Sequence, residues 1–246
     1  MTSPVSPWVR RFVPAPDAPA RLVCFPHAGG SATYYLPVAR GLAPSVDVLA
    51  IQYPGRQDRR HEPNIDDIER LADLVVAELA PWCDRPVGLF GHSMGALVAY
   101  EVARRLDTAP SVLFASGRRA PSRHRDTDVH RLDDDRLRAE LARLSGTGAG
   151  LLDDEDMLAM ILPATRADYR AVESYRYRPG PPLTCPVLAM VGDADTEATV
   201  DEVADWRAHT SGEFELRVFD GGHFYLTDHA GTVLGMVADR LPAAVR

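Results

Sequence analysis

The stretch from Val87 to Ala103 constrains this chain more than any other, because it places a strand, a sharp turn and a helix in immediate succession. Residues 87–90 form a short apolar run that is typical of a buried strand. Gly91–Gly95 then read G-H-S-M-G, which matches the pattern G-x-S-x-G, and small apolar residues follow at helical spacing. In this context the pattern predicts a nucleophile elbow, a tight turn that presents its serine at the carboxyl end of a strand.

Sterics explain why glycine stands at both ends of this turn. Strand and helix come so close at an elbow that Gly91 and Gly95 leave no room for a Cβ. The hydroxyl of Ser93 is then exposed above the helix N-terminus. The alternative is an ordinary Gly-rich turn with a capping serine, so the case for catalysis depends on the rest of the chain.

Strands and helices are predicted to alternate on both sides of this turn. The alternation predicts an α/β fold with a mostly parallel, doubly wound sheet and right-handed crossovers. We expect one α/β domain over residues 1–246, since this length suits a single core. The predicted strands are 21–25, 46–51, 87–90, 111–115, 185–191 and 214–219, and the predicted helices are 33–42, 65–79 (capped by Asn64), 96–103, 203–209 and 227–241.

The alternation stops over residues 118–183, where no run is typical of a strand. Helices are predicted at 132–144 and 151–177, separated by the Gly-rich segment 145–150. Insertions at this place in such a sheet fold over the active site as lids. The apolar residues of the insertion either pack down on the domain or line a pocket, and the methionines and leucines among them suit an acyl chain.

Three predicted loops at the carboxyl edge of the sheet carry serine, aspartate and histidine in that order, which is the order of an α/β catalytic triad. Ser93 is the candidate nucleophile. His223 follows the last strand and is the candidate general base. Asp195 follows the preceding strand and would orient and stabilise the imidazole.

Each of these choices has a rival. Asp193 lies two residues before Asp195, but an aspartate so early in a turn typically binds local backbone N–H groups. His92 lies within the turn and is expected to point elsewhere, whereas His229 falls in a predicted helix. Gly221 and Gly222 permit a tight loop just before His223, which favours His223.

The Gly-rich segment Pro26–Ser31 directly follows the first predicted strand. Such loops leave backbone N–H groups free to point inward, as the HGGG-type loops of esterases do. We therefore expect the N–H groups of Ala28 and Met94 to form an oxyanion hole. We expect His27 to anchor this loop rather than to act in catalysis.

Composition excludes several other classes of function. The net charge of −8 argues against a nucleic-acid partner, and no apolar run is long enough to cross a bilayer. The three cysteines show no C-x-x-C spacing, so neither a disulfide framework nor a metal site is indicated, and no cofactor is expected. The Pro-rich N-terminus lacks the apolar core of a signal peptide, which makes the cytoplasm the expected location.

Basic residues are nevertheless concentrated in two predicted loops. They are either solvated loop charge or a docking patch for an acidic partner. The two clusters are Arg56, Arg59, Arg60 and His61, and Arg118, Arg119, Arg123, His124 and Arg125.

Nearly the whole chain resembles the type II thioesterases that accompany polyketide synthases and nonribosomal peptide synthetases. The likeness to generic hydrolases is limited to the elbow, whereas the segment at 162–179 is specific to this family. One departure is Thr196, where the family usually has proline after the catalytic aspartate. The shared motifs are CFPHAGGS at 24–31, QYPGRQDR at 52–59, GHSMGA at 91–96, LSGT at 144–147, LPATRADYRAVESYRYRP at 162–179 and GGHFYL at 221–226.

This resemblance implies a free-standing, monomeric α/β-hydrolase. Its substrates would be acyl groups held as thioesters on the phosphopantetheine arm of an acyl or peptidyl carrier protein. Because carrier domains are typically acidic, Arg118 and Arg123 are candidates for docking them. A carboxylesterase or lipase acting on small oxoesters, and a non-catalytic binding protein with a hydrolase fold, are the alternative interpretations.

Overall fold

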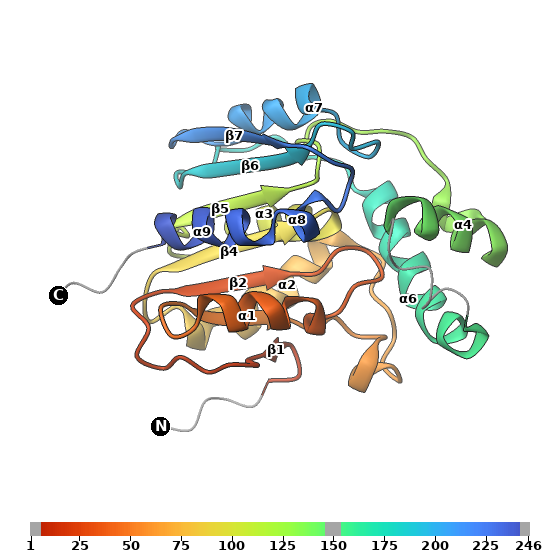
Figure 1. The fold of residues 1–246 in the computed structure, drawn as a ribbon, viewed down its shortest axis with the longest axis horizontal. Coiled ribbons are helices and arrows are strands. Elements are labelled where there is room, and N and C mark those ends of the chain that lie inside the picture. The colour runs from red at the N-terminus through yellow and green to blue at the C-terminus, as the bar shows by residue number, and fades with distance from the viewer. Residues whose placement is uncertain (1–5, 146–153, 242–246) are drawn as a thin grey trace.

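The computed structural model describes residues 6–145 and 154–241 of the chain. Within these ranges a seven-stranded sheet has the strand order β1-β3-β2-β4-β5-β6-β7 (Figure 1). Neighbouring strands are parallel except for the antiparallel pair β1 and β3. The bounds are β1 Val9–Arg10, β2 Arg21–Phe25, β3 Asp47–Ile51, β4 Val87–His92, β5 Val112–Ser116, β6 Val187–Gly192 and β7 Phe214–Phe219.

The strand order reverses at β2, which has β3 on one side and β4 on the other. At such a reversal the loops that leave neighbouring strands diverge to opposite faces and open a crevice at the carboxyl ends. The loops after β2 and β4 meet there. They carry the predicted oxyanion segment and the predicted elbow.

Helices cover both faces of the sheet (Figure 1). Strands β2 to β7 contribute side chains to both cores. In β2, for example, Leu22 and Cys24 belong to one buried cluster and Val23 and Phe25 to the other, as the alternation of side chains along a strand requires. The first cluster lies under α1 (Leu36–Leu42) and α9 (Ala230–Arg240), and the second under α2 (Ile68–Leu79), α3 (Met94–Ala103) and α7 (Val200–Ala204).

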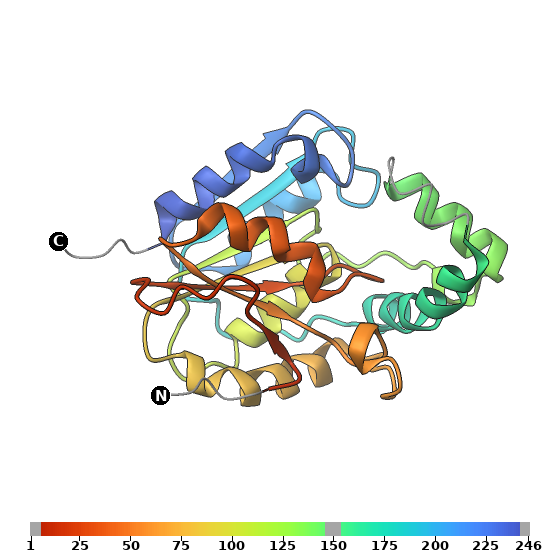
Figure 2. The same ribbon diagram turned by 60° about the horizontal axis from the view of Figure 1, so that its bottom comes forward.

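Two helices of the 118–183 insertion, α4 (Asp134–Ser145) and α6 (Glu155–Ser174), lie beyond the carboxyl ends of the strands. Figure 2 shows both helices standing apart from the layers that flank the sheet. Their apolar residues pack against one another, with Leu158 and Leu162 of α6 against Leu137 of α4. The predicted break at 145–150 lies, from residue 146 onward, outside the described residues.

The predicted alternation is confirmed, but several predicted boundaries are wrong. Helix α2 begins at Ile68 rather than at residue 65, because the carboxylate of Asp67 accepts the N–H of Arg70 at 2.8 Å. Asn64 therefore does not cap this helix. The predicted helix 227–241 is divided at His229 into α8 (Tyr225–Asp228) and α9.

Three further differences are local. Strand β1 was not predicted, because two residues are too few to show a period. The predicted helix 33–42 begins as a 3-10 turn over Ala32–Tyr35. The predicted helix 203–209 comprises the end of α7 and the 3-10 turn Asp205–His209 that follows it. No helix in the described ranges has the length and apolarity that a bilayer crossing requires.

Candidate active site

Ser93 lies on a sharp turn between β4 and α3 and has a positive φ of 55°. Its N–H donates to the carbonyl of Ser116, at the end of β5, over 2.8 Å. A Cβ on Gly91 would lie 2.2 Å from the carbonyl oxygen of Gly95, and a Cβ on Gly95 would lie 2.0 Å from that of Phe25. Both glycines are therefore required by the contact of helix and strand, as predicted.

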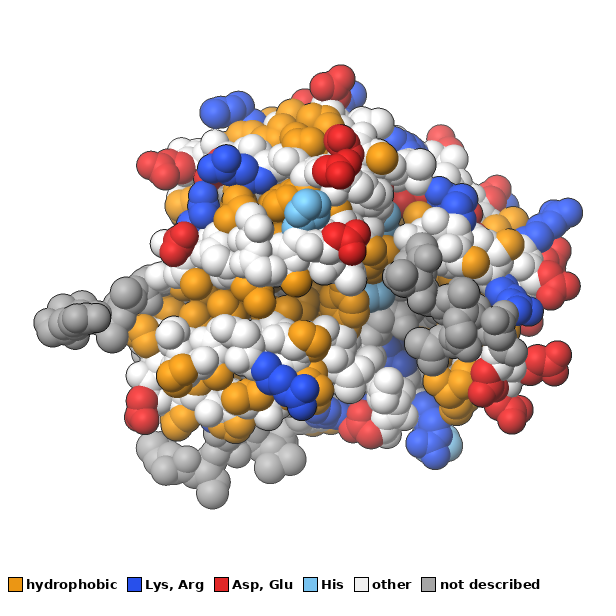
Figure 3. All heavy atoms as spheres, viewed as in Figure 1, with side chains coloured by type: hydrophobic (Ala, Val, Ile, Leu, Met, Phe, Trp, Pro, Cys, Tyr) orange, Lys and Arg blue, Asp and Glu red, His pale blue; other side chains and the backbone are white. Residues whose placement is uncertain are grey.

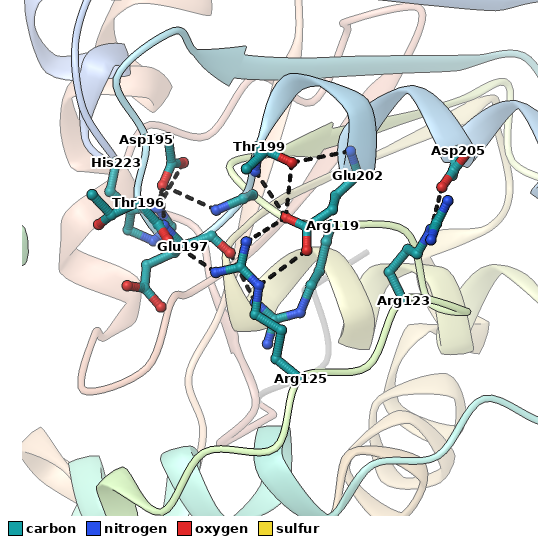
Figure 4. Close-up of polar contacts among 11 residues, drawn as sticks. Arg119, Arg123, Arg125, Asp195, Thr196, Glu197, Thr199, Glu202, Asp205 and His223 are labelled. Atoms are coloured by element: carbon teal, nitrogen blue, oxygen red, sulfur yellow. Dashed lines mark hydrogen bonds and ion pairs between the residues drawn. The ribbon is translucent and has the colours of Figure 1, made fainter.

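The imidazole of His223 is hydrogen-bonded to Asp195. Its Nδ1 donates to Oδ2 over 2.9 Å and to Oδ1 over 3.1 Å, and both side chains are buried (Figure 4). Oδ1 also accepts the N–H groups of Glu197, at 2.7 Å, and Ala198, at 3.2 Å. This donor set fixes the carboxylate, which in turn fixes the tautomer with a proton on Nδ1 and leaves Nε2 free to accept one.

Asp193 has a different partner from its neighbour Asp195. Its Oδ1 accepts the N–H of Gly221 at 3.0 Å and thereby joins the loop after β6 to the loop after β7. The same two loops touch at Gly192, where a Cβ would lie 2.2 Å from the carbonyl oxygen of Gly221. Asp193 thus stabilises the two loops that carry Asp195 and His223. The prediction that Asp193 binds a backbone N–H is confirmed, but this N–H lies in another loop, 28 residues away, and not in the same turn.

His223 and Ser93 lie at the same edge of the sheet. The ring of His92, the neighbour of Ser93, is 4.8 Å from the ring of His223 between centroids. A Cβ on Gly117 would lie 3.4 Å from Cε1 of His223, and Gly117 directly follows Ser116, the residue that binds Ser93. The elbow and the imidazole are therefore adjacent.

Two further histidines, His27 and His92, contribute neutral rings to this region. Burial, with the charges of His223 and Arg56, lowers the pKa of His27 to about 3. Burial and the same neighbour His223 hold the pKa of His92 well below its usual value. Because both rings stay neutral at physiological pH, a positive charge forming on His223 meets no like charge from them.

These two rings are held by different contacts. His92 Nδ1 lies 2.9 Å from Oγ of Ser116, which is 2.7 Å from the hydroxyl of Tyr225. His27 packs edge-on against Tyr34 and Phe224, with ring centroids 4.7 and 5.1 Å away. His27 thus anchors its loop by packing.

The 27–32 loop, which follows β2, turns at Gly29 with a φ of 74°. The N–H of Gly30 donates to the carbonyl of His27 at 2.9 Å and closes the turn. The N–H groups of Ala28 and Met94 donate to no acceptor within residues 6–145 and 154–241. Two backbone donors beside the elbow serine are thus available to an external oxygen.

A family model described as a thioesterase domain matches residues 20–241. This chain belongs to the thioesterase family.

Individual relatives narrow the class within this family. Thioesterase PikA5 of Streptomyces venezuelae is 51% identical over 239 residues, which cover 95% of this chain and 85% of that protein. The type II thioesterase BorB from the borrelidin biosynthetic cluster superposes with a TM-score of 0.92 at 50% identity, covering 97% of this chain and 99% of that one.

YbtT, a type II thioesterase from the yersiniabactin NRPS/PKS pathway, superposes with a TM-score of 0.83 at 33% identity, covering 96% of this chain and 98% of that one. Together these relatives confirm both the α/β-hydrolase fold and the predicted resemblance to type II thioesterases.

Most of the arginines that formed the two predicted basic clusters are buried in the thioesterase. Arg56, Arg59, Arg118 and Arg119 are between 5% and 9% exposed. The interpretation of these four as solvated loop charge is therefore wrong. Arg118 is equally unsuited to docking a carrier protein, because only 9% of it is exposed.

The other two arginines of the second cluster, the exposed Arg123 and the half-buried Arg125, are paired with carboxylates of the same protein (Figure 4). Arg123 binds Asp205, and Arg125 binds Glu202 at 2.5 Å. An arginine that is already paired contributes little net field to an approaching acidic partner. The sequence pattern therefore overstated the positive charge that this loop presents.

Thr196, the departure from the family pattern, has a contact of its own. Arg143 of α4 donates to the Thr196 hydroxyl and to the carboxylate of Glu197, each over 2.6 Å. The insertion is thereby attached to the residues that directly follow Asp195. The sequence carried no signal for this contact, since arginine at position 143 is typical of the solvated last turn of a helix.

An apolar cavity of about 270 Å³ lies between α1 and α9. Figure 3 shows apolar side chains gathered in the hollow between these helices. The cavity adjoins the 27–32 loop, because Tyr34 lines it and also packs on His27. Other lining residues are Phe90, Leu226 and Val233.

Proposed function

We propose that this thioesterase hydrolyses acyl thioesters carried on the phosphopantetheine arm of a carrier protein, with Ser93, His223 and Asp195 as a catalytic triad. The observation that carries the triad is the buried hydrogen bond from His223 Nδ1 to Asp195 beside the strained elbow of Ser93. The class of substrate rests on the type II thioesterases to which the chain is similar.

The first half-reaction transfers the acyl group to the enzyme. His223 Nε2 takes the proton of the Ser93 hydroxyl, and Oγ attacks the thioester carbonyl carbon. The resulting oxyanion accepts hydrogen bonds from the N–H groups of Ala28 and Met94. The C–S bond then breaks, and the pantetheine sulfur leaves as a thiol with the proton that His223 took from Ser93. The acyl group stays on Ser93 as an ester, and His223 is neutral again.

The second half-reaction returns the enzyme to its starting state. His223 removes a proton from water, and the hydroxide attacks the acyl-Ser93 ester. The same two N–H groups hold the second oxyanion, and collapse returns the proton to Ser93 and releases the carboxylic acid. A thiol has a pKa of about 8.5, so it leaves more readily than an alkoxide, and both attack steps rather than departure need the base.

Replacement of Ser93 by alanine tests the nucleophile. We expect turnover of an acyl-carrier thioester to fall by about 10⁴-fold or more with the unfolding temperature unchanged. Folded Ser93→Ala protein with full activity would refute the assignment. Paired assays of the wild type on the carrier-bound acyl group and on a p-nitrophenyl ester of the same acid test the substrate class, and a higher kcat/KM on the ester would favour a carboxylesterase.

A further inference from the structure

Helix α6 of the insertion contacts the 27–32 loop directly. A Cβ on Gly29 would lie 2.6 Å from the Thr165 hydroxyl, so glycine is needed where the helix meets the loop. Asp168 follows Thr165 by three residues and therefore lies on the same face of α6. This face presents a carboxylate to the backbone that carries one of the two candidate oxyanion donors.

The carboxylate of Asp168 is completely buried and fully engaged. Its Oδ2 accepts the N–H of Gly29 at 2.8 Å and a guanidinium N–H of Arg56 at 2.7 Å. Its Oδ1 accepts a second N–H of Arg56 at 2.8 Å. This is a bidentate Arg–carboxylate pair joining residues 112 positions apart, and it holds one backbone N–H of the loop as well.

Arg56 extends the same support to the next residue of the loop. Its guanidinium donates to the carbonyl of Gly30 over 3.0 Å. Gln52 completes the arrangement, because its amide oxygen accepts the N–H of Ala32 at 2.9 Å and its amide N–H donates to the carbonyl of Arg56 at 3.3 Å. Backbone groups of Gly29, Gly30 and Ala32 are thus held by buried side chains.

We propose that Asp168 and Arg56 are positioning residues that make the oxyanion hole dependent on the seating of α6. The proposal rests on the proposed function, since it assigns the Ala28 N–H to the oxyanion. Neither side chain touches the reacting atoms. They act through the loop backbone. Because Asp168 lies on α6, the position of the loop depends on the position of the insertion.

The physical reason is the stiffness of the peptide group. The Ala28–Gly29 peptide is planar, so holding the Gly29 N–H fixes the orientation of the bond that follows the Cα of Ala28. The direction of the Ala28 N–H can then change only through the backbone rotations at Ala28 itself. Displacement of a catalytic donor by about 1 Å costs on the order of 100-fold in rate, so release of this anchor is expected to affect turnover strongly.

The test variant replaces the ion pair by apolar side chains, Arg56→Met together with Asp168→Leu. A buried ion pair exchanged as a whole for apolar residues often leaves stability unchanged or improved, whereas removal of one partner strands a buried charge. We expect the double variant to unfold near the wild-type temperature. On an acyl-pantetheine thioester we expect kcat to fall by about 10- to 100-fold with KM changed by less than about threefold.

Two inhibitors separate positioning from general damage. A trifluoromethyl ketone analogue of the acyl chain forms a tetrahedral adduct on Ser93 whose oxyanion occupies the hole, whereas a non-hydrolysable thioether of pantetheine only fills the site. We expect the double variant to bind the ketone about 10-fold more weakly or worse, and the thioether with nearly unchanged affinity.

Tyr175→Phe is the matched control. The hydroxyl of Tyr175, at the end of α6, donates to the buried carboxylate of Glu101 over 2.7 Å, so it also ties the insertion to the sheet domain but does not touch the loop. We expect its kcat and its ketone affinity to stay within about threefold of the wild type.

The outcomes distinguish this proposal from the proposed function. Wild-type protein that does not hydrolyse the thioester would refute the function. Active wild type with an equally active double variant, or with equal losses of ketone and thioether affinity, would refute the positioning role. If the double variant does not fold, Asp168→Asn replaces it. Its amide oxygen still accepts the Gly29 N–H, so we expect the folded variant to retain ketone binding better than substrate turnover. Complete loss of ketone binding in folded Asp168→Asn would overturn the proposal.

Discussion

Asp195→Asn exchanges one carboxylate oxygen for an amide group, and the structure predicts which one. Oδ1 accepts the N–H groups of Glu197 and Ala198, so the amide oxygen of the variant is expected to stay there. The NH₂ group then occupies the place of Oδ2, 2.9 Å from Nδ1 of His223. Two donors cannot face each other, so the imidazole has to move its proton to Nε2, which can then no longer accept the proton of Ser93.

Loss of the correct tautomer in a triad with intact geometry costs about 10⁴-fold in kcat, or about 5 kcal/mol in the activation barrier. Steady-state hydrolysis of an acyl-pantetheine thioester measures this loss, and we expect KM to change little. The matched control is Asp193→Asn, since its amide oxygen can still accept the Gly221 N–H. The reasoning is refuted if Asp195→Asn keeps activity within about tenfold of the wild type, or if Asp193→Asn loses as much.

Two further predictions concern stability. In Gly95→Ala the new Cβ would lie 2.0 Å from the carbonyl oxygen of Phe25, so we expect a loss of about 3 kcal/mol and an unfolding temperature lower by roughly 6–12 °C. Gly235→Ala, whose Cβ meets nothing within 4 Å, is the control, and similar melting of both variants would contradict the elbow geometry. Burial lowers the pKa of His209 to about 4. Below pH 6.5 the unfolded chain therefore binds a proton at His209 that the folded protein does not bind. The free energy of unfolding falls between pH 6.5 and about 4, by about 2 kcal/mol at pH 5. Urea unfolding at pH 7.5 and pH 5 should show a smaller difference for His209→Gln than for the wild type, and an equal difference would show that His209 does not titrate in this way.

The fold and the candidate site residues could largely be predicted because their signals are local. The elbow occupies adjacent residues, its glycines are required by contacts that any such turn makes, and the strands are continuous apolar runs. Asp195 and Asp193 could be ranked from their positions in the turn. Asp195 binds His223, as predicted, whereas Asp193 binds a backbone N–H of another loop, that of Gly221, and not one of its own turn. Their roles in catalysis remain the subject of the tests above.

The burial of arginine could not be predicted in this way. Whether Arg56 is solvated or buried depends on Asp168, which is 112 residues away and belongs to the insertion. A run of basic residues in a loop looks the same in both cases. Helix starts failed for a related reason, because Asn64 and Asp67 are both good caps and the choice between them depends on how the chain enters α2.

The candidate oxyanion donors are main-chain groups, so the amide at position 28 depends on the backbone path and not on the side chain of Ala28, whereas the side chain of Met94 is constrained by its place in the core. Ala28 is only half-buried, so side chains other than that of alanine can present the same amide there, whereas proline has no amide N–H. The restriction on the amino acid falls instead on Gly29, because its left-handed backbone and its contact with Thr165 leave no room for a side chain. In a library with every substitution at positions 28 and 29, we expect most variants at position 28 to stay active and most at position 29 to lose activity. This result would indicate a catalytic backbone N–H, which only substitution by proline removes.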